Sequence, residues 1–176
     1  MNKERTIPFI QELFELCCAE QFQQYECEID LATEGEVELT HSSIATIEAG
    51  SQDLEITVSM HLSYNVLLLT YPSSDVNIED SILDDWTSEF ANQLLGRVKH
   101  KLLEYQCNLN MGLPECAHDE ELDTFIPETG ITKIYAFDID NEIFKCAITI
   151  ELFNKDLELK KSEGSETLQE GEMAFF

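Results

Sequence analysis

A carboxylate, a carboxamide and a glycine recur at helical spacing within the stretch Glu89-Phe90-Ala91-Asn92-Gln93-Leu94-Leu95-Gly96. With about 100° of rotation per residue, Glu89, Asn92 and Gly96 fall on one stripe, opposite an apolar face. That face comprises Trp86, Phe90, Ala91, Leu94, Leu95, Val98, Leu102 and Tyr105. A glycine inside a helix costs about 1 kcal/mol relative to alanine, and core packing does not explain one that lies off the apolar face. We therefore expect another molecule to approach the helix closely at Gly96.

Basic residues gather directly after this stripe. Arg97, Lys99 and Lys101 are three of only ten lysines and arginines in the chain, and His100 lies among them. On the helical projection Lys99 and His100 flank the stripe, while Leu103 places an apolar group on it. Two interpretations stay open. The cations form a basic rim that offsets repulsion from an acidic partner, or they complement the C-terminal half of the helix dipole.

Two long helices are predicted from apolar residues at helical spacing. Ile7 to about Gln23 forms the first, with one buried face. The helix that carries the stripe begins between Asp80 and Asp85, where acidic residues suit the positive end of the helix dipole, and runs to about Tyr105.

Several stretches rich in β-branched residues predict strands. They are Tyr25–Leu31, Val37–His41, Ser43–Ile47, Leu54–Leu62 and Asn65–Tyr71, with a hairpin of Ile131–Asp138 and Glu142–Phe153 near the end. Residues 107–129 look like a loop that includes an edge strand near Asn108–Leu113. Because apolar and polar residues alternate, the strands are expected to be antiparallel with one face on a core. The predicted fold class is α+β, an antiparallel-dominated sheet with two long helices packed on it.

Length and charge limit the classes of protein to consider. A length of 176 residues indicates one domain, expected over residues 1–159, followed by an acidic, disordered tail over residues 160–176. The formal charge of −26 argues against nucleic acid and anionic membrane surfaces as partners. No stretch approaches the length of a membrane span and no signal-peptide core forms, so we expect no membrane insertion and a cytoplasmic location.

Metal binding is not expected of this chain. The six cysteines show no zinc spacing and read as reduced, packed thiols. The stretch Asp138-Ile139-Asp140-Asn141-Glu142 lacks the glycine and terminal glutamate of a calcium loop, so a hairpin turn is favoured. Cys116 and His118 stand beside Asp119, Glu120 and Glu121, where a divalent ion is conceivable, but an acidic loop exposed to solvent is favoured.

The pattern E-x-x-N-x-x-x-G, formed by Glu89, Asn92 and Gly96, resembles the signature of the CheC/CheX family of chemotaxis phosphatases. The context agrees over roughly residues 5–155. An amphipathic helix and strands precede the pattern, and an N-L-N-x-x-L-P segment (Asn108 to Pro114) and a closing hairpin follow it. Because the chain holds one copy of the pattern, it is more similar to CheX than to CheC.

That resemblance implies an activity and a partner. The family removes the phosphoryl group from the aspartyl phosphate of CheY-type response regulators, so the expected partner is a phosphorylated CheY-like response regulator. Asn92 would orient the attacking water, because a carboxamide accepts a hydrogen bond without repelling the phosphoryl charge. Glu89 would pair with the regulator's active-site lysine. The regulator supplies the magnesium ion, so this chain needs no cofactor of its own, and a homodimer joined edge to edge is expected.

Two departures from the family pattern qualify this resemblance. The family has a further helix between the central strands and the stripe helix, whereas the segment from Ser73 to Asp85 is short and acidic. Arg97 and Lys99 are also large where the family tends to have smaller residues, which would either change the choice of partner or hinder entry into the receiver's site. A second hypothesis is a non-catalytic binding module for a receiver domain or a motor component, because the flagellar switch proteins share the fold.

Overall fold

The computed structural model describes residues 5–32, 42–72, 80–118 and 120–161. Within these residues, antiparallel strands form one seven-stranded sheet in the order β1-β6-β7-β3-β2-β4, and β5 also pairs with β2. The strands are β1 (Ile29–Leu31), β2 (Ser42–Gly50), β3 (Leu54–Ser63), β4 (Asn110–Met111), β5 (Glu115–His118), β6 (Ile131–Ile139) and β7 (Glu142–Leu152). The antiparallel sheet and the closing hairpin are therefore confirmed.

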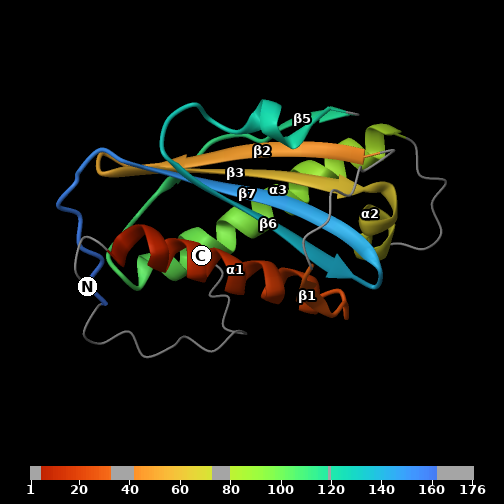
Figure 1. The fold of residues 1–176 in the computed structure, drawn as a ribbon, viewed down its shortest axis with the longest axis horizontal. Coiled ribbons are helices and arrows are strands. Elements are labelled where there is room, and N and C mark those ends of the chain that lie inside the picture. Colours follow the sequence, from red (N-terminus) through yellow and green to blue (C-terminus); the bar gives the residue numbers. More distant parts are fainter. Residues whose placement is uncertain (1–4, 33–41, 73–79, 119, 162–176) are drawn as a thin grey trace, which may run out of the picture.

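Two long helices cover one face of this sheet, α1 (Thr6–Gln23) and α3 (Asp80–Leu103), and both are confirmed within a few residues of the predicted bounds (Figure 1). The register of β2, β3 and β7 places Ile47, Val58 and Ile148 in one apolar row on that face. Aromatic rings join the layers. The Phe22 ring centroid on α1 lies 5.2 Å from that of Phe90 on α3 and 5.1 Å from that of Phe144 on β7.

The two long helices end in the same way. After α1, Glu26 has a φ of +61°, and the backbone N–H of Cys27 donates to the Phe22 carbonyl at 3.2 Å. After α3, Gln106 has a φ of +59°, and the backbone N–H of Cys107 donates to the carbonyl of Leu102 at 3.1 Å. A left-handed residue that closes the last turn satisfies free carbonyls and stops the helix.

A third helix, α2 (Tyr64–Thr70), corrects two predictions. The stretch Asn65–Tyr71, predicted as a strand, is almost entirely this helix. Ser63 starts it, since its side chain accepts a hydrogen bond from the Val66 backbone N–H at 3.2 Å. In the chain, α2 follows the central strand β3 and precedes α3, and it lies at one end of the sheet (Figure 1). The expectation of no helix between the central strands and α3 was therefore also wrong.

The segment after α3 contains more structure than the predicted loop. The edge strand near Asn108–Leu113 is confirmed as β4, but β5 was not predicted and continues the pairing with β2. A short 3₁₀ helix, η2 (Leu122–Phe125), covers the sheet face opposite the long helices. There Ser59 donates a hydrogen bond to the Phe125 carbonyl at 2.7 Å.

The remaining predictions have mixed outcomes. Of the strand Tyr25–Leu31 only β1 forms, and Val37–His41 lies outside the described residues, as do residues 162–176. The hairpin turn is confirmed, with φ values of +52° at Asp140 and +69° at Asn141. All six cysteines are free thiols. In the described part of the chain, no helix has the length and apolar character that crossing a membrane requires.

Candidate functional site

The stripe of Glu89, Asn92 and Gly96 lies away from the core, as predicted. Phe90, Leu94 and Val98 on the opposite side of α3 are completely buried, whereas Glu89 is exposed and Asn92 and Gly96 are partly exposed. The helix thus packs with one face and presents the stripe with another. The helical projection of the sequence therefore gave the correct orientation of α3.

Space above Gly96 is open. A Cβ atom built at this position would meet no atom within 4 Å beyond its immediate neighbours. Within the described residues, packing therefore gives no reason for a glycine in the middle of α3. The open backbone allows close approach of another molecule.

Gln93 connects the stripe to α1. Its side-chain Oε1 accepts hydrogen bonds from Gln21 Nε2 at 2.9 Å, from Gln24 Nε2 at 3.2 Å and from the Tyr25 hydroxyl at 3.0 Å. Burial raises the pKa of Tyr25, so its hydroxyl keeps the proton that it donates. Three donors on one oxygen fix the orientation of the Gln93 carboxamide. If the amide were flipped, its NH₂ group, itself a donor, would point at these three donors.

The fixed carboxamide holds Glu89. Gln93 Nε2 donates to Glu89 Oε1 at 2.9 Å across one helical turn. The second carboxylate oxygen of Glu89 has no partner within the described residues. Glu89 is therefore oriented through one oxygen and presents the other to solvent, which suits a carboxylate that receives a cation from another molecule.

Asn92 differs from Glu89 in having no internal partner. No hydrogen bond joins its carboxamide to any group in the described part of the chain. Both its oxygen and its NH₂ group are therefore available to a bound molecule. The chemistry that such a group performs is positioning, because it can accept from a water molecule and donate to an oxyanion at once.

The four predicted partner-contacting residues are all accessible, with different surroundings. Gly96 and Lys99 are partly exposed, His100 is exposed, and the Leu103 side chain is 43% exposed. Lys99 and Leu103 share the exposed face of α3 with the stripe, whereas His100 lines a groove described below. No ion pair joins Lys99 to a carboxylate of the described residues.

Arg97 and Lys101 extend the contact between α3 and α1. Arg97 Nε donates to Gln21 Oε1 at 2.7 Å, and its Nη2 donates to Gln24 Oε1. Lys101 Nζ pairs with Glu20 Oε1 at 2.8 Å. Burial alone would lower the pKa of Lys101, but the hydrogen bond and charge of Glu20 outweigh it and raise that pKa. The two cations thus hold α1, which neither sequence interpretation of the basic residues included.

An open groove of about 710 Å³ runs between the end of α1 and α3. Gln93, Gly96, Arg97 and His100 line it on the α3 side. Trp86 and Lys101 of α3 also line it, and its other walls come from Glu20, Gln24, Tyr25 and Pro72. The groove adjoins the stripe, since Gly96 belongs to both and Gln93 is bonded to Glu89.

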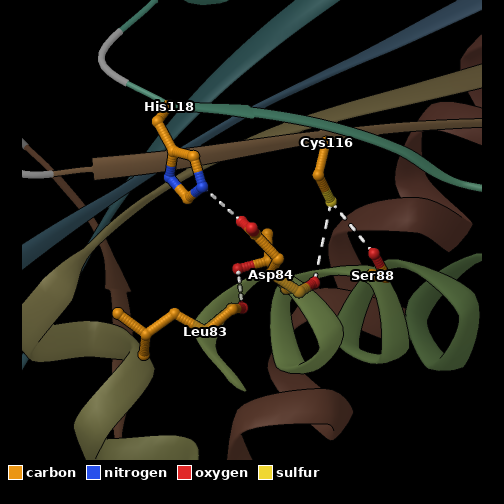
Figure 2. A network of polar contacts seen from close by, with 6 residues as sticks. Leu83, Asp84, Ser88, Cys116 and His118 are labelled. Atoms are coloured by element: carbon orange, nitrogen blue, oxygen red, sulfur yellow. Dashed lines mark hydrogen bonds and ion pairs between the residues drawn. The ribbon is translucent and has the colours of Figure 1, made fainter. Parts of the chain in front are cut away.

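On its other side, α3 contacts β5 through short side chains (Figure 2). Cys116 Sγ lies 3.0 Å from Ser88 Oγ, and His118 Nε2 lies 2.5 Å from Asp84 Oδ1. Burial raises the pKa of the Cys116 thiol, the Ser88 hydrogen bond opposes the rise, and Asp84 and Asp85 add to it. The thiol is therefore protonated at neutral pH and is no nucleophile.

These contacts give Cys116 and His118 partners within the protein. Within the described residues, no three histidine, cysteine or acidic side chains are arranged to hold one. Asp119, considered beside them in the sequence, lies outside those residues.

The residues that sequence reasoning missed are Gln93 and its α1 partners Gln21, Gln24 and Tyr25. The spacing of Glu89 and Gln93 by four positions was a visible signal, because such pairs face each other on a helix. The approach of α1 was not visible, since it depends on how the two helices cross the sheet.

Solved structures of chemotaxis proteins have a similar fold. The CheX protein of Vibrio vulnificus matches with a TM-score of 0.64 at 14% identity, over 81% of this chain and 96% of its own. A chain of the CheX-CheY-BeF3-Mg²⁺ complex from Borrelia burgdorferi matches with a TM-score of 0.58 at 12% identity, over 80% of this chain and 96% of its own. Thermotoga maritima FliY matches with a TM-score of 0.53 at 15% identity, over 84% of this chain and 89% of its own.

No family model matches the sequence, and neither does any curated protein. The structural likeness extends over four fifths of the chain. This chain therefore has the α+β fold of the CheX and CheC-like chemotaxis proteins.

Proposed function

We propose that this chain is a CheX-like phosphatase that hydrolyses the aspartyl phosphate of a CheY-type response regulator. The observation that carries the proposal is the pairing on one exposed stripe of Asn92, whose carboxamide is free, with Glu89, which Gln93 orients. A CheX solved in complex with CheY supports a receiver domain as the partner.

The reaction needs one positioned water molecule. An aspartyl phosphate is an activated acyl phosphate, so catalysis consists mainly of placing the water in line with the bond that breaks. The Asn92 oxygen accepts a hydrogen bond from this water, and its NH₂ group faces the phosphoryl oxygens without repulsion. The water oxygen bonds to phosphorus, the bond to the aspartate oxygen breaks, and the products are inorganic phosphate and the free aspartate carboxylate.

Glu89 contributes binding in this proposal. Its free oxygen pairs with a lysine of the regulator's active site, and this pairing positions the stripe so that Asn92 reaches the phosphorylated aspartate. The acidic pocket of the regulator would hold the magnesium ion, which would supply neutralisation of phosphoryl charge there. A receiver domain as the substrate also implies a cytoplasmic location for the chain. The resemblance to CheX suggests a homodimer, which sedimentation would test.

A second candidate is a binding module without turnover. It is supported by the fold shared with Thermotoga maritima FliY and with a chain of the FliM-SpeE complex from Helicobacter pylori, which has a TM-score of 0.54 at 9% identity. Such a module would bind a receiver domain or a motor component through the same stripe. The two candidates differ in whether the lifetime of the aspartyl phosphate changes.

The test is release of phosphate from the phosphorylated receiver domains of the organism that encodes this chain. Asn92→Ala should slow hydrolysis about 100-fold and keep the affinity, because it removes only the group that positions water. Glu89→Ala should mainly weaken binding. If the wild-type chain binds but adds nothing to the spontaneous rate for any receiver, the binding module is correct. A reversed pattern between the two variants would refute the assigned roles.

A further inference from the structure

Arg97 is a cation that the chain orients but does not neutralise. Both of its hydrogen-bond partners are uncharged carboxamides, Gln21 in α1 and Gln24 directly after its last residue. No carboxylate in the described part of the chain forms an ion pair with it. In a chain of formal charge −26, with 36 acidic residues available as partners, this arrangement is unusual.

Lys101, one turn further along α3, shows the ordinary alternative. Its ammonium group pairs with Glu20 Oε1 at 2.8 Å, so a carboxylate from the same stretch of α1 compensates its charge. Both cations line the groove between α1 and α3. The difference between them is therefore local. Glu20 neutralises the charge of Lys101, whereas the two glutamines accept hydrogen bonds from Arg97 without neutralising its charge.

In the described part of the chain, the outer edge of the Arg97 guanidinium has no hydrogen-bond partner. The Nε–H and the neighbouring N–H of Nη2 donate to the two glutamines, which leaves the parallel N–H groups of Nη1 and Nη2. That pair of donors matches the two oxygens of a carboxylate. Because α1 holds the guanidinium, a carboxylate that enters the groove meets a donor whose orientation is already set.

The groove also adjoins the stripe. Gly96 contributes to both, and apart from its chain neighbours and the backbone of its own helix, a Cβ there would meet no atom within 4 Å. Gln93, which bonds Glu89, forms part of the same wall. A molecule bound over Glu89 and Asn92 would therefore place its adjoining surface against Arg97.

We infer that the groove between α1 and α3 is a second contact site for the receiver domain, and that it takes an aspartate or glutamate side chain of that domain onto Arg97. The inference rests on the proposed function and adds to it the chemistry of the partner. Glu89 and Asn92 act at the phosphorylated aspartate and are expected to serve any receiver. Arg97 then selects the receivers that carry a carboxylate at the adjoining position.

The experiment compares two variants that change the net charge equally. Arg97→Gln removes the cation from the groove. Lys133→Gln removes one from β6, where Lys133 lies 3.8 Å from Glu15 Oε2. In the sheet, β7 separates β6 from β3 and β2, the strands that α3 contacts. Both variants and the wild-type chain are titrated with the receiver domain loaded with beryllofluoride and Mg²⁺, at low and at high salt, after circular dichroism has established that they fold.

At low salt, Arg97→Gln should weaken binding about tenfold, and this loss should shrink at high salt because the lost contact is electrostatic. Lys133→Gln should change the affinity less than about twofold. Arg97→Lys should restore part of the affinity, since it keeps the charge without the paired donors. An aspartate or glutamate of the receiver whose replacement by the amide removes the advantage of Arg97 identifies the contact.

Failure of this inference differs from failure of the proposed function. If the wild-type chain hydrolyses the aspartyl phosphate and the Arg97→Gln and Lys133→Gln variants bind equally, the groove contact is refuted and the phosphatase stands. An equal loss at both salt concentrations would also refute it, since Arg97 would then act through packing. If no receiver binds the wild-type chain, both proposals fail.

Discussion

The two sides of α3 hold the helix with different chemistry. Toward α1, the long side chains of Gln93 and Arg97 share the partner Gln21, and Lys101 pairs separately with Glu20; we call these contacts the α1 flank. Toward β5, Ser88 and Asp84 make short contacts with Cys116 and His118, the β5 flank. The stripe of Glu89, Asn92 and Gly96 lies between these flanks. Only the α1 flank bonds to a stripe residue, since Gln93 holds Glu89.

The two flanks therefore have different roles: the β5 flank attaches α3 to the sheet, and the α1 flank positions side chains of α3. The β5 flank ties the first half of α3 to the sheet edge and reaches no stripe residue through its hydrogen bonds. The α1 flank fixes the direction of a carboxylate and of a guanidinium, both of which face an open surface. We therefore expect substitutions in the α1 flank to change partner binding and those in the β5 flank to change stability alone.

Among the variants that compare the two flanks, the largest effect is expected from Gln93→Ala. The substitution frees the Glu89 side chain and removes the acceptor of three donors, so affinity for the receiver should fall about tenfold. The rate of hydrolysis at saturation should stay unchanged, because Asn92 is not bonded to Gln93. Titration and single-turnover phosphate release measure the two quantities.

Ser88→Ala is the matched control from the β5 flank, one helical turn before Asn92. It should change the affinity less than about twofold, because it removes a contact to the Cys116 thiol only. Equal losses in Ser88→Ala and Gln93→Ala would show that the two flanks do not differ in role.

Gly96→Ala tests the open position between the flanks. Alanine favours the helix by about 1 kcal/mol over glycine, and nothing blocks the added methyl group, so the free energy of unfolding should rise. Partner affinity should fall in the same variant if another backbone approaches α3 here. Urea unfolding and titration give both values, and an unchanged affinity would show that Gly96 does not serve close approach.

The smallest effect is expected from His118→Gln. Its contact with Asp84 is partly exposed, with side chains 45% and 39% accessible, so the loss of unfolding free energy should be about 0.5 kcal/mol. Phosphate release should not change. A clear loss of hydrolysis would place the β5 flank in the site and remove the distinction drawn between the two sides.

Periodicity was sufficient to predict the elements that carry the site. The helices α1 and α3 and the β6–β7 hairpin have regular apolar spacing, and the same spacing placed Glu89, Asn92 and Gly96 away from the core. It failed for α2, whose sequence Val66-Leu67-Leu68-Leu69 is continuously apolar and shows neither a helical nor a strand period. The deciding signal was Ser63 as the N-cap, which only the backbone geometry revealed.

The contacts around the stripe could not be predicted for another reason. A helical projection gives the direction of a side chain but not its partner, and Gln93 meets Gln21 because two helices far apart in sequence pack on one sheet. Arg97 shows the same limit. Its sequence position suggested a rim cation or a dipole effect, whereas the structure shows it held by two glutamines of α1.

The open backbone at Gly96 has an evolutionary consequence. Residues on the exposed side of α3 can be replaced without disturbing the buried side, where Phe90, Leu94 and Val98 keep the fold. Natural variation at Lys99 and Leu103 can therefore alter the choice of partner one substitution at a time, at little cost in foldability. Descendants of one ancestral chain could diverge in signalling specificity while their architecture, and the reaction proposed at Asn92, stayed constant.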